Sequence, residues 1–90
     1  MKIILEESFS LALIDILHYI AKDKKSAAMQ FRHTLQKKIH LLKQSPFMCK
    51  QSLYFIDKNY RDLTYLGYTI VYKVDHDNIK VLDIFKYENR

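Results

Sequence analysis

The side chains best suited to act on a nucleic acid lie in the last third of the chain. Arg61 opens a stretch of alternating apolar residues, and Lys86, Tyr87 and Arg90 lie at its end. A guanidinium fixed beside a sheet can grip a phosphate or a carboxylate through two parallel hydrogen bonds. A tyrosine between cations can stack on a base while those cations hold its phosphate. These four residues therefore form a candidate site for phosphate binding or phosphate chemistry.

A purely structural role is the alternative for the same residues. Arg61 has two acids within reach of the predicted sheet, Asp62 and Asp83, and an ion pair with either would neutralise it. Tyr87 would then only cap the core. The sequence leaves both interpretations open.

Other chemistries lack the residues that they need. The four histidines and the lone Cys49 form no metal-binding spacing, and there is no glycine-rich phosphate loop or serine nucleophile motif. We therefore expect no metal and no cofactor. A free cysteine without a paired histidine or lysine is expected to be inert.

A second candidate surface is a long stretch without acidic residues. Between Asp23 and Asp57 there is no aspartate or glutamate, and the whole net charge of +5 arises from residues 1–50. Such a field attracts an acidic partner or a nucleic acid. The plainer interpretation is a solvated basic helix face. The candidate binding residues are Lys37, Lys38, Lys43, Lys50 and Arg61.

Ninety residues with a single glycine and a single proline predict one domain, residues 1–90, without a flexible linker. An apolar fraction of 49% suits a globular core. No stretch is apolar for long enough to cross a membrane, and no signal-peptide core follows the N-terminus. Together with the unpaired Cys49, this indicates a reducing cytoplasm.

The first half of the chain predicts a strand and two helices. Lys2–Leu5 is a short apolar run with β-branched residues, which indicates a strand. Two helix-spaced apolar stripes follow, and the residues between them, about four in number, predict an antiparallel helical hairpin with Ser26 as the second N-cap. The stripes are Phe9, Leu13, Ile16, Leu17 and Ile20, then Ala28, Phe31, Leu35, Ile39 and Leu42.

The second half predicts a loop and a meander of three strands. Pro46 ends the second helix, and residues 46–59 have no period, so we expect a loop that lies against the body. The strands are expected at about Tyr60–Leu66, Tyr68–Val74 and Ile79–Tyr87, with a tight turn at Gly67 and a four-residue turn at residues 75–78. The fold class is α+β, with the meander packed on the hairpin.

Apolar residues on both faces of the meander predict strands that are covered twice. On the middle strand, Tyr68, Ile70, Tyr72 and Val74 share one face, and Val71 lies on the other. On the last strand, alternation places Val81 and Phe85 on one face, and Leu82 and Ile84 on the other. The hairpin would cover one face, and the loop of residues 46–59 or a bound partner would cover the second.

This order of motifs resembles the RelE/ParE superfamily of toxins from bacterial type II toxin–antitoxin systems. The similarity spans about residues 2–88. Asp15–Asp23 resembles the signature of the first helix, Tyr60–Leu63 the Arg-x-Leu at the start of the meander, and Tyr68–Tyr72 the Tyr-x-Ile-x-Tyr of the middle strand. The resemblance implies a toxin that arrests growth and is neutralised by a cognate antitoxin in a hetero-oligomeric complex.

Within the superfamily, the resemblance implies two competing mechanisms. ParE-like members inhibit DNA gyrase, and Pro46–Lys50 resembles their Pro-x-Met-Gly-Arg segment, with Cys49 replacing the glycine. RelE-like members are ribosome-dependent mRNA endonucleases, whose site would here be Arg61, Lys86, Tyr87 and Arg90. Lys86 stands where a histidine or arginine is usual in either branch. The Tyr-Ile-Ala of residues 19–21 and the Pro-x-Met of residues 46–48 favour the ParE-like branch. A third hypothesis is a non-toxic module of the same fold that binds protein or nucleic acid.

Overall fold

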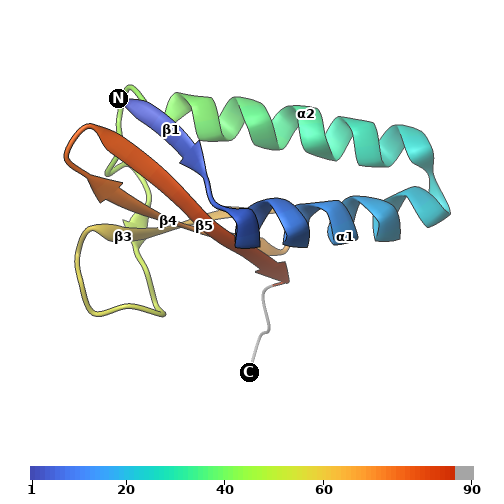
Figure 1. The fold of residues 1–90 in the computed structure, drawn as a ribbon. Coiled ribbons are helices and arrows are strands. Elements are labelled where there is room, and N and C mark those ends of the chain that lie inside the picture. Colours follow the sequence, from blue (N-terminus) through green and yellow to red (C-terminus); the bar gives the residue numbers. More distant parts are fainter. Residues whose placement is uncertain (87–90) are drawn as a thin grey trace.

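A computed structural model describes residues 1–86 and shows an α+β fold in which two helices lie across one sheet (Figure 1). The chain runs from strand to helical hairpin to meander, as the sequence predicts. The elements are β1 (Lys2–Leu5), α1 (Glu7–Asp23), α2 (Lys25–Leu41), β2 (Lys50–Gln51), β3 (Tyr60–Tyr65), β4 (Tyr68–Asp75) and β5 (Asn78–Lys86).

The sheet is mixed and has the strand order β1-β5-β4-β3-β2. The meander of β3, β4 and β5 is antiparallel, and β1 joins it in parallel beside β5, with Ile3 opposite Ile79. The expected loop of residues 46–59 contains a strand that the sequence did not predict. This strand, β2, pairs Lys50 with Asp62 and Gln51 with Arg61. Two residues are too few to show a period, so only the pairing reveals them.

The helical hairpin forms as expected, but its connection is tighter than predicted. A single residue, Lys24, separates α1 from α2, where about four residues were expected. Lys24 takes an extended conformation, its N–H donates to Ile20 O, and its carbonyl accepts from Ala27 N at 3.1 Å. The prediction of Ser26 as the N-cap is wrong, because α2 has already begun at Lys25 and no side chain caps it.

The core lies between the hairpin and one face of the sheet. The ring of Phe31 packs against Tyr65 and Tyr68, with centroids 5.2 and 5.3 Å apart. Burial of such rings and of aliphatic side chains is the main force that holds the helices on the sheet. The buried cluster is Phe9, Phe31, Leu35, Ile39, Leu42, Tyr68, Ile70, Tyr72, Val74, Ile79, Val81 and Ile84.

A β-bulge in β5 changes which of its residues face the core. Val71 pairs with Asp83, but the next residue of β4, Tyr72, pairs with Val81, so Leu82 is an extra residue without a partner. The alternation predicted for the last strand is therefore wrong beyond the bulge. Val81 and Ile84 both face the core, whereas Phe85 lies on the outer face against Tyr54, at a centroid distance of 5.1 Å.

Both hairpin turns of the meander contain two residues. Leu66 and Gly67 have φ values of 48° and 84°, the left-handed pair that suits the twist of a two-residue hairpin. The turn between β4 and β5 was expected to span residues 75–78. Asp75 and Asn78 are instead paired strand residues, and the turn is His76 and Asp77 alone.

Candidate functional site

The guanidinium of Arg61, on β3, is hydrogen-bonded to the backbone of residues 46–59, the segment that precedes this strand. Its Nε donates to Lys58 O and its Nη1 to Cys49 O, each at 3.0 Å, and its Cζ lies 4.8 Å from the ring centroid of Phe47. In the described part of the chain, the ion pairs involve Asp75 and not Arg61. Neither sequence interpretation foresaw this arrangement. Arg61 pairs with no acid here, and it spends two of its five N–H donors on backbone carbonyls.

Tyr72 makes a second attachment to the same loop. It is fully buried opposite Arg61 in the sheet, and its hydroxyl donates to Pro46 O at 2.7 Å. Burial, and then the hydrogen bond and charge of the Cys49 side chain, raise the pKa of Tyr72 far above its ordinary value. The phenol therefore stays neutral at physiological pH and serves as a hydrogen-bond donor rather than as a base.

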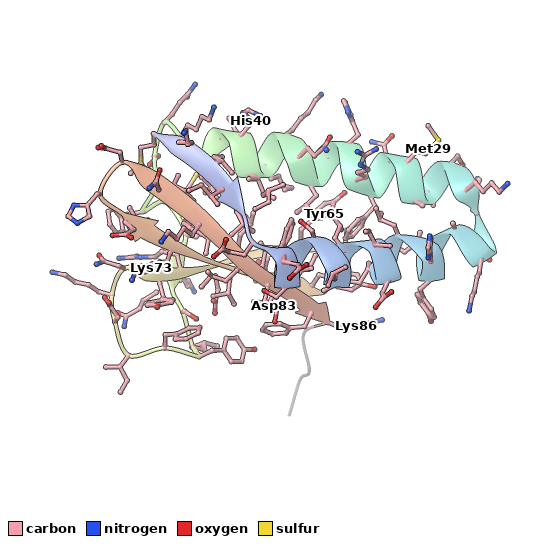
Figure 2. The ribbon with its side chains drawn as sticks, viewed as in Figure 1. Met29, His40, Tyr65, Lys73, Asp83 and Lys86 are labelled. Carbon is pink, nitrogen blue, oxygen red and sulfur yellow. The ribbon has the colours of Figure 1, made fainter. Side chains whose placement is uncertain are left out.

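The structure does not bring Arg61 and Lys86 to one point. Arg61 pairs across the sheet with Tyr72 and Lys86 with Tyr68, so their backbone positions are offset by four residues along the strands, about 13 Å, and lie on strands separated by β4. Lys86 lies instead at the end of β5, with its ammonium 5.9 Å from the ring centroid of Tyr68 (Figure 2). Tyr87 and Arg90, the other two predicted members of the set, lie outside the described residues.

The predicted binding lysines are spread over several surfaces. Lys37 lies on the outer side of α2 near His33 and His40, whereas Lys38 stands over the ring of Tyr65, 5.4 Å from its centroid. Lys43 follows α2, and Lys50 is exposed on β2 at the sheet edge. The acid-free stretch is therefore a general positive field and not a single basic patch.

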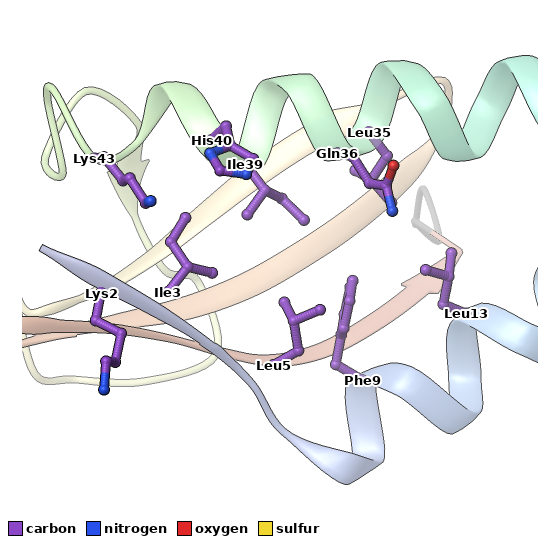
Figure 3. A pocket seen from close by; sticks show the side chains of 10 residues that line it. All are labelled: Lys2, Ile3, Leu5, Phe9, Leu13, Leu35, Gln36, Ile39, His40 and Lys43. Carbon is purple, nitrogen blue, oxygen red and sulfur yellow. The ribbon is translucent and has the colours of Figure 1, made fainter.

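An apolar groove lies between β1 and α2 on the described residues. Its volume is about 500 Å³. Figure 3 shows Ile3 and Leu5 of β1 facing Leu35 and Ile39 of α2, with Phe9 at the base of α1. Lys2, Gln36, His40 and Lys43 also line it, so its walls are mainly apolar and its charged residues are the two lysines.

The sequence contained a signal for this groove. Lys2–Leu5 is apolar and β-branched, but a strand of four residues at the edge of the sheet has a partner on one side only. Leu5 stays half-exposed for that reason, although it belongs to the face that covers the core. An edge strand with exposed apolar residues beside a basic helix end indicates a place where another chain can add.

Comparison with known proteins identifies the family. Residues 3–89 match the family model described as ParE toxin of type II toxin-antitoxin system, parDE. The chain belongs to the ParE toxin family. A solved structure described as the chromosomal ParDE TA system from P. aeruginosa has the same fold. Its TM-score is 0.80 at 18% sequence identity, and the match covers 98% of this chain and 97% of that one. No curated protein sequence matches the chain.

Membership of the ParE family confirms the resemblance to the RelE/ParE superfamily that the sequence shows. It also places the chain in the ParE family within that superfamily. A toxin of a type II system has a cognate antitoxin, so the implied protein partner follows from the family. Within residues 1–86, neither helix has the length and apolarity of a membrane-crossing segment.

Proposed function

We propose that this ParE-family chain arrests bacterial growth by binding DNA gyrase, with no hydrolytic centre of its own. The proposal rests on the hydrogen bonds of Arg61, which hold its guanidinium on the backbone of the protein itself. Its guanidinium is bonded to Lys58 O and Cys49 O, and the backbone position of Lys86 is offset from that of Arg61 by about 13 Å along the strands. An endonuclease needs a proton acceptor, a donor and cations around one phosphate, whereas a binding toxin needs only a complementary surface.

The antitoxin, in this proposal, places an amphipathic segment in the groove between β1 and α2. Apolar side chains of the segment would cover Ile3, Leu5 and Ile39, and the free edge of β1 offers backbone groups to an added strand. Lys2 and Lys43 at the groove favour aspartate or glutamate on that segment. This agrees with the net charge of +5, which speeds the approach of an acidic chain.

Two assays on the purified protein test the target. We expect it to inhibit supercoiling by DNA gyrase and to leave mRNA uncut in translating ribosomes, as seen by toeprinting. Cuts in the ribosomal A site together with unaffected supercoiling would replace the proposal with the endonuclease hypothesis. Normal growth during induction of a folded protein without its antitoxin would favour the non-toxic module.

A charge-reversal pair tests the position of the antitoxin. Lys2→Glu combined with Lys43→Glu should weaken antitoxin binding about tenfold at low salt, and less at high salt, because two attractive charges become repulsive. The matched control is Lys22→Glu with Lys25→Glu at the far tip of the helical hairpin. An equal loss of affinity in both pairs would show that total charge matters and that the groove does not.

A further inference from the structure

The loop between β2 and β3 displays large apolar side chains to solvent. Four of the fourteen exposed large hydrophobics in the described part of the chain lie in this loop, at Leu53, Tyr54, Phe55 and Ile56. Two of them form a tip, since Leu53 is 81% exposed and Ile56 is 97% exposed. The loop projects from the sheet on the side away from α2 (Figure 1). Apolar side chains gathered in this way mark an interaction site more often than chance exposure.

This loop is ordered although its tip is exposed. Asp62 Oδ2 accepts from Leu53 N at 3.0 Å, Gln51 Nε2 donates to Ile56 O at 2.8 Å, and Ser52 N donates to Tyr60 O at 2.8 Å. Below the tip, the rings of Phe55 and Tyr60 stack with centroids 4.1 Å apart. A loop held by such bonds presents Leu53 and Ile56 in fixed positions, so a partner that binds them pays little ordering entropy.

The charges around the tip select an acidic partner. The cations Lys50, Lys58, Arg61 and Lys73 lie in or beside the loop, and they outnumber its three neighbouring acids, Asp57, Asp62 and Asp83. Asp57 and Asp62 also accept backbone N–H groups of the loop itself. A second copy of this chain would bring another positive surface against the first, which disfavours self-association.

The chemistry of the tip favours a protein over a nucleic acid. Leucine and isoleucine fill apolar pockets, but they offer no flat face on which a base can stack. The ring of Tyr60 below the tip is already engaged, because Phe55 stacks on it and the ammonium of Lys73 is 5.3 Å from its ring centroid.

The tip is distant from the groove assigned to the antitoxin. The groove lies along β1, the loop joins β2 to β3, and β1 and β2 are the two outer strands of the sheet. Four strand spacings separate these edges, about 19 Å. One surface is therefore free to contact a target while the other receives a different chain.

We infer that the tip formed by Leu53 and Ile56 is the surface with which this toxin engages its target, at an apolar site with an acidic rim on a protein. The inference rests on the proposed function, since it concerns the same growth-arresting contact. It adds the residues that make the contact and the chemistry of the surface that receives them.

The test compares two double variants of the full chain. Leu53→Gln with Ile56→Gln removes the tip, and Leu11→Gln with Met29→Gln changes two exposed apolar residues on the helical hairpin as the matched control. Growth arrest after induction, affinity for purified gyrase and affinity for the antitoxin are measured for both variants, and circular dichroism confirms their fold. We expect the tip variant to lose growth arrest and at least tenfold in gyrase affinity, with antitoxin affinity changed less than about twofold. The control should resemble the wild type.

Several results would overturn the inference. One is a tip variant as toxic as the wild type, and another is a tip variant that loses antitoxin and target binding equally. A third is loss of toxicity in Lys50→Gln with Lys58→Gln while the tip variant stays toxic, which would indicate phosphate contacts with a nucleic acid. If the wild type arrests growth without binding gyrase, the proposed target is refuted. The role of the tip is then tested by whether the tip variant still arrests growth. A wild type that leaves growth unaffected refutes both.

Discussion

Replacing Tyr72 with phenylalanine isolates the phenol that ties the loop of residues 46–59 to the sheet. The ring stays in place, so the change removes the hydroxyl with its hydrogen bond to Pro46 O and its contact with the Cys49 side chain. One such bond between neutral groups contributes about 1 kcal/mol to the free energy of unfolding. We therefore expect Tyr72→Phe to be about 1 kcal/mol less stable than the wild type at neutral pH.

The same phenol makes the stability of the wild type depend on pH. Burial and the neighbouring Cys49 raise the pKa of Tyr72 in the folded protein, whereas in the unfolded chain it titrates near its ordinary value of about 10. Above that value, the unfolded state binds fewer protons than the folded state, so stability falls as pH rises. The contribution of the neutral phenol is complete below about pH 10 and declines by about 1.4 kcal/mol for each further unit.

The two effects cross. Tyr72→Phe lacks the ionisable group, so it escapes this decline and should be the more stable protein by about pH 11. Urea unfolding followed by circular dichroism measures both proteins at neutral and alkaline pH. Tyr19→Phe is the control, because that phenol is 66% exposed, and we expect it to follow the wild type throughout. A difference between Tyr72→Phe and the wild type that stayed constant from neutral to alkaline pH would refute a phenol held neutral by burial.

Three further substitutions test the loop, the turn and the core. Arg61→Lys cannot form both bonds of the guanidinium, so it should lower stability by about 2 kcal/mol and speed amide hydrogen exchange across residues 46–58. Arg32→Lys on the exposed side of α2 should change neither, and equal exchange in both variants would contradict the role of Arg61. Gly67→Ala places a side chain at φ 84° and should cost about 1–2 kcal/mol in thermal unfolding, and an unchanged melting temperature would argue against this turn. Leu35→Ala removes a side chain that is 1% exposed and should cost about 3 kcal/mol in urea unfolding, with a loss below about 1 kcal/mol counting against the packing described.

The layout of the fold could be read from the sequence because it depends on local periods. The stripe from Ala28 to Leu42 and the alternation from Tyr68 to Val74 each match one face of a regular element, and all of these residues except Ala28 belong to the core cluster. Burial of one face forces such patterns, so they survive in a single sequence. The strand at Lys2–Leu5 followed from its composition in the same way.

Features that depend on pairing between distant segments of the chain could not be predicted from the sequence. The bulge at Leu82 exists because β5 has one more residue than β4 at that point, which only the pairing of the two strands reveals. The sequence indicates it weakly, since the core residues Ile79, Val81 and Ile84 are spaced by two and then by three. The role of Arg61 depends on the carbonyl of Cys49, twelve residues earlier. No spacing rule tells whether a guanidinium meets a ligand or a backbone oxygen, because both need the same donors.

The pairing of β1 with β5 also bears on how this chain folds as it is synthesised. The first strand of the chain finds its partner only in residues 78–81, and the same segment is the neighbour of β4. No N-terminal fragment that lacks those residues can complete the sheet, so closure waits for almost the entire polypeptide and its contacts have high sequence separation. Premature termination before residue 78 therefore yields an open sheet. The producing cell meets a finished toxin only when translation is nearly complete.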